Sequence, residues 1–500
     1  MQEALSQFLT PYVVSLVLAG TSLGIVVGAI PGLTGTMVIA LTLPLTFGMV
    51  AQDAMILLVS LYVGAISGGM ITATLLRMPG TPASIVTTLD GYPLARQGKP
   101  ERALGLGVLA SVCGGLISWI FLFLLARPIA GYSREFGPFD YFSLVMMAMV
   151  LICSVGGKSP VRAIFAGFLG LLLSMPGISP ATGQARLTFG WTELNEGFAL
   201  LPVLIGLFAI NQIFQDIGRP GLAENDQQLQ VRQVTYRWYD LQRHWSNLLR
   251  SSLIGTWIGM LPGIGANIGS VSSYTVARSL SENPEKFGEG SEEGIVAAEA
   301  ANNATIGGGL IPLVAMGLPG SVVEAVLLGA LVLHGFQPGP RLFDQSPELV
   351  YAIIFTCLFA TIAMGLLMTF LMKYLAGLAR LPRSQLFPLI LVFCVVGSFA
   401  IGNRWLDVWV MLAFGFLGFI LESRNIPLAP LVIGFVLGPI AEENLSAGLM
   451  STGGNWLPLL TEPKSLMFLA VALLLLIFPL AKKLWFPTGK GRISSRGETT

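Results

Sequence analysis

Long apolar runs, separated by short polar segments, make up most of the chain. The clearest runs lie near residues 12–30, 54–76, 103–126, 139–155, 161–175, 198–214, 351–372, 386–401, 405–421 and 465–481. Shorter or interrupted runs lie near 36–50, 252–277, 295–318, 321–334 and 427–440. A helix needs roughly 20 apolar residues to cross a bilayer. The pattern therefore predicts an all-α polytopic membrane protein with roughly ten to fourteen membrane elements.

The polar segments suggest how the chain is divided and oriented. The stretch 219–247 is polar and mixed in charge, which predicts a cytoplasmic linker with a surface helix. It separates a first membrane repeat (1–218) from a second (248–485), and the basic end (486–500) is expected to be a cytoplasmic tail. Because Lys and Arg favour the cytoplasmic side, segment 96–102 is placed inside and the segment near 336–342 outside. The side on which the N-terminus lies stays open.

Composition strengthens the membrane assignment and removes several functions. The chain is 54% hydrophobic and only 11% charged, whereas a soluble protein has about 25% charged residues. Its net charge of +1 offers no argument for binding nucleic acid. Its four cysteines lie singly in apolar runs and its two histidines are far apart, so we expect no metal site. We find no clustered His, Asp, Glu or Cys that would indicate an enzyme.

One glycine-rich motif occurs twice. LGIVVGAIPGLTG (23–35) aligns with IGTWIGMLPGIGA (254–266), and ISGGMITATLLRMPGT (66–81) aligns with TIGGGLIPLVAMGLPGS (305–321). The offset between copies grows by about nine residues, which the charged stretch 281–293 explains as a loop insertion. Two ordered sets with an explicable gap indicate a duplication. Since the segments that follow the copies (96–102 and about 336–342) are placed on opposite sides, the repeats are predicted to be inverted.

Each copy interrupts its apolar segments with Pro-Gly, which predicts broken helices or re-entrant hairpins. Such irregular backbone at membrane depth is tolerated inside protein or beside a watery cavity. The freed N–H groups carry partial positive charge and bind anions, while freed carbonyls suit a cation. Small polar residues around the breaks complete a predicted substrate site of Thr34, Gly35, Thr36, Arg77, Gly80, Thr81, Asn267, Asn302, Asn303, Gly320 and Ser321. The predicted cation site consists of Gly32, Gly263, Ser270 and Thr305. Helix packing is the alternative explanation for any single glycine.

Three ionisable residues, Arg77, Glu299 and Glu324, lie within this apolar framework. Such residues are costly in lipid and are usually paired or functional. Arg77 precedes one Pro-Gly break and Glu324 follows the other, so an Arg77–Glu324 ion pair is a hypothesis. The alternative is that Arg77 extends to the membrane interface.

Four strings resemble the large membrane subunit of tripartite tricarboxylate transporters, the TctA family. They are IPGLTGTM (30–37), MPGTPASIVTTLDGYPLARQG (78–98), EAANNATIGGGLIPL (299–313) and LPGSVVEAVLLGALVLHGFQPGP (318–340). The resemblance covers about residues 10–480. It implies a multi-pass protein of the bacterial inner membrane that works with a small membrane subunit (TctB-like) and a periplasmic solute-binding protein (TctC-like). It also implies uptake of citrate or related carboxylates, driven by a Na⁺ or H⁺ gradient and without a cofactor.

The sequence departs from the family pattern at two positions. Arg77 stands where a small polar residue is more usual, and Glu324 stands where small residues are usual. The departures leave the particular carboxylate open. A binding-protein-dependent secondary transporter is the favoured function, and a channel or a membrane-embedded enzyme acting on a small anion is the alternative.

Overall fold

The computed structural model confirms the all-α polytopic class. It describes residues 8, 10–30, 33–155, 159–179, 182–217, 231, 234–378 and 387–485. Gly32, the tail 486–500 and most of 219–233 lie outside the described residues. Within the described part, seven helices are long and apolar enough to cross a membrane, and six shorter apolar helices of 10–17 residues accompany them. These elements fit the expected range of membrane elements.

The first half of the chain contains twelve helical elements and one short hairpin in the described residues. They are α2 (Pro11–Gly28), α3 (Gly35–Thr46), α4 (Ala51–Leu76), η1 (Pro82–Ile85), α5 (Thr87–Arg96), α6 (Pro100–Ser133), α7 (Pro138–Val155), α8 (Pro160–Ser174), η2 (Thr192–Glu196), α9 (Leu200–Ile205), η3 (Gly206–Ile210) and α10 (Asn211–Ile217). Strands β1 (Gly177–Ile178) and β2 (Ala185–Arg186) pair antiparallel. Proline occupies the first position of several of these helices, where its missing N–H costs nothing.

The second half contains twelve further helical elements in the described residues. They are α11 (Trp238–Met260), α12 (Gly265–Leu280), η4 (Pro284–Lys286), α13 (Glu292–Met316), α14 (Val322–Leu333), α15 (Leu342–Gln345), α16 (Pro347–Leu378), α17 (Phe387–Gly402), α18 (Trp405–Ser423), α19 (Leu428–Ser451), α20 (Leu457–Thr461) and α21 (Pro463–Trp485). Residues 238–247, assigned above to the linker, form the first turns of α11. The division into two repeats and a linker stays a prediction.

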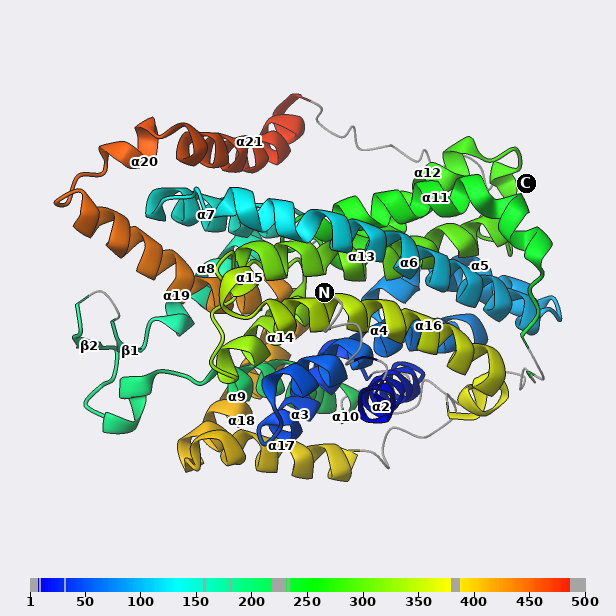
Figure 1. Ribbon diagram of the computed structural model, residues 1–500, viewed down its shortest axis with the longest axis horizontal. Coiled ribbons are helices and arrows are strands. Elements are labelled where there is room, and N and C mark those ends of the chain that lie inside the picture. Colours follow the sequence, from blue (N-terminus) through cyan, green and yellow to red (C-terminus); the bar gives the residue numbers. More distant parts are fainter. Residues whose placement is uncertain are drawn as a thin grey trace, which may run out of the picture.

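Two helices, α4 and α13, form the centre of the molecule. In α13, 22 of 25 residues are buried, and in α4 94% of the most apolar 18-residue window is buried. The outer helices instead expose large apolar side chains, such as Leu124, Phe168, Phe370 and Trp409. Figure 1 shows α6, α7, α13 and α16 along the long axis, with the β1–β2 hairpin at one end and α5 near the other. Exposed apolar side chains around a buried centre are expected when lipid is the solvent.

Small residues bring the helices of each copy into close contact. A Cβ added at Gly24 of α2 would lie 2.3 Å from the Leu61 carbonyl oxygen of α4. A Cβ added at Gly255 of α11 would lie 2.3 Å from the Ala301 carbonyl oxygen of α13. The two copies of the motif therefore pack in the same way, each with a glycine against the backbone of its partner helix.

Candidate functional site

The predicted Pro-Gly breaks after α4 and α13 are real helix ends, and the two ends have the same geometry. Arg77 closes α4 in the left-handed region (φ 55°, ψ 23°), and Gly317 closes α13 at φ 73°, ψ 24°. In both, the next N–H reaches back six residues, from Met78 to the Thr72 carbonyl (3.3 Å) and from Leu318 to the Pro312 carbonyl (3.2 Å). This bond spans one residue more than the bond of a Schellman cap, and it likewise folds the chain back over the last helical turn after a left-handed residue. Arg77 thus holds a position that glycine holds in the second copy.

Behind each cap, three glycines meet. A Cβ added at Gly80 would lie 2.4 Å from the Gly28 carbonyl oxygen and 2.6 Å from the Gly69 Cα. At Gly320, the equivalent distances are 2.6 Å to the Gly259 carbonyl oxygen and 3.2 Å to the Gly309 Cα. The chain segments that follow both breaks are therefore held directly against the backbone of two helices, because no side chain separates them.

Polar contacts join the two copies across the centre of the molecule. The Ser67 hydroxyl of α4 donates to the Asn303 side-chain oxygen of α13 at 2.6 Å. Toward one end, Thr46 lies 3.4 Å from the His334 ring nitrogen, and toward the other the Gln97 side chain donates to the Glu289 carbonyl at 2.7 Å. From the Thr46 end to the Gln97 end, the residue numbers of these partners rise in the first copy (46, 67, 97) and fall in the second (334, 303, 289). These contacts favour the inverted relation, which remains a prediction.

Glu299 is the first of two fully buried carboxylates at this centre. The Thr87 hydroxyl donates to its Oε1, and the Ser111 hydroxyl lies 3.4 Å from its Oε2. Asn302 lies beside it, completely buried, yet neither atom of its amide makes a hydrogen bond of ordinary geometry. Asn303 donates to the Glu299 main-chain carbonyl at 3.2 Å. The predicted pair Asn302–Asn303 therefore lies in a buried polar cluster with unused hydrogen-bonding capacity.

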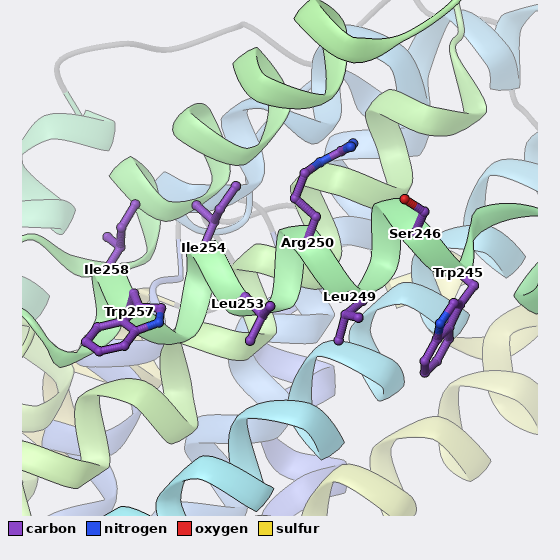
Figure 2. A pocket seen from close by; sticks show the side chains of 8 residues that line it. All are labelled: Trp245, Ser246, Leu249, Arg250, Leu253, Ile254, Trp257 and Ile258. Carbon is purple, nitrogen blue, oxygen red and sulfur yellow. The ribbon is translucent and has the colours of Figure 1, made fainter.

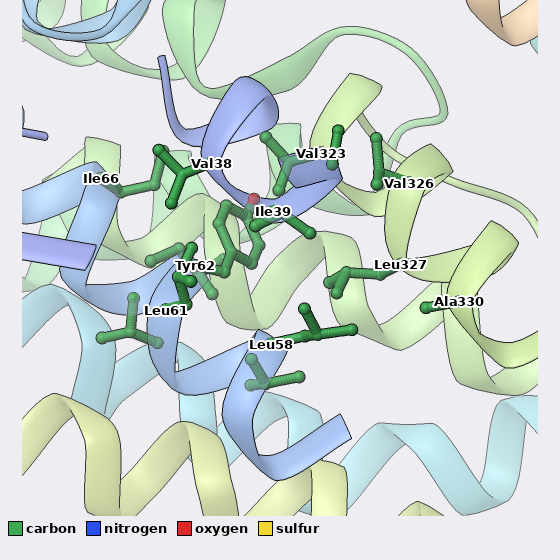
Figure 3. Packing of buried hydrophobic residues seen from close by; sticks show 14 of the residues in the cluster. Val38, Ile39, Leu58, Leu61, Tyr62, Ile66, Val323, Val326, Leu327 and Ala330 are labelled. Carbon is green, nitrogen blue, oxygen red and sulfur yellow. The ribbon is translucent and has the colours of Figure 1, made fainter. Parts of the chain in front are cut away.

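Glu324, in the first turn of α14, is the second buried carboxylate. Tyr62 of α4 donates to its Oε1 at 2.6 Å. Its Oε2 makes no hydrogen bond of ordinary geometry, and neither does the Ser321 hydroxyl, which lies near this carboxylate at the residue before α14. The backbone leaves room for this carboxylate, because a Cβ added at Gly309 would lie 2.4 Å from Oε1. Figure 3 shows Tyr62 between α3 and α14, surrounded by aliphatic side chains.

Arg77 does not form the hypothesised ion pair with Glu324 in this structure. Its side chain is exposed, and its guanidinium lies 5.7 Å from the centre of the Tyr92 ring. Glu324 is 1% exposed and bonded to Tyr62. The left-handed cap directs the Arg77 side chain away from the interior. Sequence order alone, which places both residues next to a break, did not reveal this difference in direction.

The other predicted substrate residues are divided between the centre and its edge. Thr81 is buried and its hydroxyl has no partner, while its N–H is capped by the Ser84 hydroxyl at 3.0 Å. Thr34 caps α3 by accepting from the Met37 N–H at 3.3 Å, and Gly35 and Thr36 are buried in the next turn. Asn267 is exposed on α12. Thr81, Asn302, Gly320 and Ser321 therefore remain the strongest members of the predicted set.

Three of the four predicted cation residues, Gly263, Ser270 and Thr305, lie in the described part of the chain. The Ser270 hydroxyl donates to the Ala298 carbonyl (3.2 Å), and the Thr305 hydroxyl donates to the Asn302 carbonyl (2.6 Å). Gly263 lies in the turn between α11 and α12 with a positive φ of 76°, where an added Cβ would collide with Ile152. The two hydroxyls thus donate to helix carbonyls, and Gly263 packs against Ile152. Their role as cation ligands stays a prediction.

Sequence reasoning missed the α4 side of the site, in particular Tyr62 and Ser67. A signal was present, because Ser60, Ser67 and Thr74 recur every seven residues in an apolar helix and so lie along one stripe. The structure buries all three, and the hydroxyls of Ser60 and Thr74 have no partner. Polar residues that recur on one face of a central membrane helix indicate a polar interior.

Charged residues gather at the polar ends of α6, α11 and α13, outside the apolar spans. Arg102 binds Asp240 through two hydrogen bonds of 2.6 and 2.7 Å and binds Glu292 through two of 2.8 and 2.9 Å. His244 and Arg102 hold the pKa of the Glu292 carboxyl well below its usual range. At the same end, the Asp90 carboxylate accepts three main-chain N–H groups of the inserted loop, from Gly288, Gly290 and Ser291, at 2.7–2.9 Å.

An open groove on the outer face of α11 is a poor candidate for the site. One helix lines it, with mostly apolar side chains between Trp245 and Ile258 (Figure 2). An exposed apolar face on one helix of a membrane protein is expected to contact lipid. The buried polar centre between α4 and α13 is therefore the better candidate.

Comparison with known proteins confirms the resemblance seen in the sequence. The pattern of the family described as "Tripartite tricarboxylate transporter TctA family" matches residues 14–433. An uncharacterized 52.8 kDa protein in the TAR-I ttuC' 3' region of Agrobacterium vitis is 34% identical over 475 residues, which cover 94% of each chain. An uncharacterized protein in the TAR-II ttuC' 3' region of the same organism is 34% identical over 226 residues, 45% of this chain and 93% of that protein. No solved structure matches the chain significantly.

Proposed function

The chain belongs to the tripartite tricarboxylate transporter TctA family, and on that basis we propose that it is a permease subunit that takes up small carboxylates by ion-gradient-driven alternating access. Family membership makes it a multi-pass membrane component of a transporter that has other subunits. The proposal adds a small membrane subunit, a periplasmic binding protein that delivers the substrate, and the bacterial inner membrane as the location.

The observation that carries the proposal is a set of buried polar groups at this centre that make no hydrogen bond of ordinary geometry. They are the Thr81 and Ser321 hydroxyls, which directly follow the two Pro-Gly breaks, and the Asn302 amide, which lies beside Glu299. An unsatisfied buried polar atom costs about 1–3 kcal/mol, so several of them together indicate a site that a polar ligand completes. Hydroxyls, an amide and helix-start N–H groups suit a carboxylate, which accepts hydrogen bonds.

The duplicated architecture supports alternating access. Two copies with equivalent caps and equivalent glycine contacts can exchange conformations around a site between them. A carboxylate that enters the membrane interior needs its charge offset, and a co-transported Na⁺ or H⁺ supplies that offset. We therefore expect uptake to depend on an ion gradient and not on ATP.

Reconstituted proteoliposomes test this function. The complex, with its small membrane subunit, is supplied with the binding protein and a panel of tri-, di- and monocarboxylates. We expect accumulation only when the binding protein and an inward Na⁺ or H⁺ gradient are both present. Flux that needs neither would support a channel, and chemical conversion of the carboxylate would support a membrane-embedded enzyme.

Paired asparagine variants test the site itself. Asn302→Ala removes an unpartnered buried amide, and we expect uptake to fall at least about tenfold, because one lost charge-assisted hydrogen bond is worth about 1.5–3 kcal/mol. Asn283→Ala is the control, since Asn283 is exposed in the inserted loop. Equal uptake by the two variants, at equal amounts of folded protein, would contradict the proposed site.

A further inference from the structure

The most unusual side chain at the centre is Glu324, because its negative charge has no counter-charge. It is 1% exposed, and the shortest hydrogen bond to its carboxylate comes from the neutral Tyr62 hydroxyl. The Ser321 hydroxyl and main-chain N–H groups at the start of α14 also lie close to the carboxylate, and none of these groups carries a full charge. Oε2 and the hydroxyl of Ser321, the residue that precedes α14, make no hydrogen bond of ordinary geometry. Aliphatic side chains of α3, α4 and α14 surround the Tyr62 ring (Figure 3).

The helices that surround Glu324 contain no basic side chain. Helix α14 packs against α3, α4, α9, α13 and α19, and none of these six helices contains Lys or Arg. An ionised carboxylate in a membrane interior is stable when it is paired with a cation, and otherwise it becomes neutral by binding a proton. The described surroundings of Glu324 offer no cation. The N–H groups at the start of α14 favour the ionised form but carry only partial charge, so the binding of a proton is the route that neutralises the carboxylate.

The titratable groups on these helices and their neighbours are few. Tyr62 donates to Glu324, and Cys357 of α16 lies near Tyr62. Glu299 lies on α13, ten residues before Gly309, which corresponds to about 15 Å along a helix. The remaining groups lie toward helix ends: Asp53 bonded to Tyr12, His334 beside Thr46, the pair Glu292–Glu293, and the pair Glu442–Glu443.

We propose that Glu324 is a proton-binding site and that its protonation links proton binding to carboxylate binding. The proton is taken from the aqueous phase, resides on the unpartnered Oε2 and is released to the aqueous phase on the other side. Oε1 keeps its hydrogen bond from Tyr62. The inference rests on the proposed function, since it identifies the coupling ion of that same site as H⁺.

The position of Glu324 explains the linkage. It follows the second Pro-Gly break, where a substrate carboxylate is expected to meet Gly320 and Ser321. Two carboxylates close together in a medium of low dielectric cannot both remain ionised. The substrate anion therefore binds to the protonated form of Glu324, and release of either one weakens the binding of the other.

Infrared difference spectroscopy of the purified complex tests the proton site without any substrate. Glu324→Gln is compared with wild type across a pH series, with Glu348→Gln as the matched control because Glu348 is exposed at the start of α16. We expect a protonated-carboxyl C=O band that Glu324→Gln removes and Glu348→Gln retains. Tyr62→Phe is expected to shift the frequency of this band while the carboxyl remains.

Two spectroscopic outcomes would overturn the proposal. One is a band that Glu324→Gln leaves intact, including one that Glu299→Gln removes instead. The other is a band that disappears when Na⁺ is added at constant pH, because Na⁺ would then be the ion that occupies the carboxylate. If Glu324→Gln folds poorly, Tyr62→Phe still tests the site, because a band that changes frequency but is not lost belongs to the carboxyl that Tyr62 contacts.

Transport separates failure of this inference from failure of the proposed function. Glu324→Gln is expected to lose the stimulation of uptake by an inward pH gradient but to retain exchange of internal for external substrate. Unchanged stimulation would overturn the coupling role and leave the transporter intact. No carboxylate uptake by the wild-type complex would overturn the proposed function, whereas the infrared result would still decide the proton site.

Discussion

Replacing Gly24 or Gly255 by alanine should weaken the protein by similar amounts, because each glycine contacts a helix backbone in the same way. The added Cβ would lie 2.3 Å from the Leu61 carbonyl oxygen in the first case and 2.3 Å from the Ala301 carbonyl oxygen in the second. Ordinary contacts of this type need more than about 3 Å, so each helix pair must separate by roughly 1 Å. A gap of this size removes about a quarter to a half of the dispersion energy of the atoms involved.

Overpacking of a close contact typically costs about 1–3 kcal/mol, and we expect each variant to lose stability in this range. Gly131→Ala in α6 is the matched control, because an added Cβ there meets nothing within 4 Å. Helix propensity should make it neutral or more stable by up to about 1 kcal/mol.

The unfolding temperature of the detergent-solubilised protein measures the difference in stability. Unfolding is detected as the loss of protein from the monodisperse fraction. Both interface variants should unfold at lower temperature than wild type, and Gly131→Ala should not. The reasoning is refuted if either interface variant matches Gly131→Ala. A large loss in only one of them would show that the two copies do not pack equivalently.

Three further predictions concern the helix cap and the charged end of the molecule. Arg77→Gly should raise the unfolding temperature, because relief of about 1–2 kcal/mol of left-handed strain exceeds the loss of an exposed cation–π contact of about 0.5–1 kcal/mol. Arg77→Ala should lower the unfolding temperature, because it loses the contact and keeps the strain. The opposite order of the two variants would contradict this account. Asp90→Ala frees three N–H groups of the inserted loop, so limited proteolysis should cut near 288–291 faster, and an unchanged rate would refute the clamp. Because the pKa of Glu292 is lowered in the folded chain, its stabilisation should be present above about pH 4.3 and be lost as the pH falls through the folded pKa. Arg102→Gln should reduce that pH dependence of the unfolding temperature, and a variant with the wild-type pH profile would contradict it.

The local features of the site were predictable, and the contacts between distant segments were not. The pairs Pro79-Gly80 and Pro319-Gly320 were each expected to interrupt a helix, because proline lacks an N–H and glycine tolerates unusual backbone angles. The side chains that meet at the centre were harder to predict. Tyr62 and Glu324 are 262 residues apart, and their contact depends on how several helices pack.

The sequence by itself determined that lipid surrounds much of the protein, that the protein belongs to the all-α polytopic class, and that one motif occurs twice. Apolar runs long enough to cross a bilayer, few charges and a motif carried twice are properties of the chain that need no tertiary contact to be recognised. Only the tertiary structure decided which polar groups face the interior and which partners they have. Arg77 and Glu324 each stand beside a break, but a left-handed cap directs one outward to Tyr92, while the first turn of α14 directs the other inward to Tyr62. Side-chain direction depends on backbone angles and on the register of packed helices, and the order of residues along the chain does not specify that register.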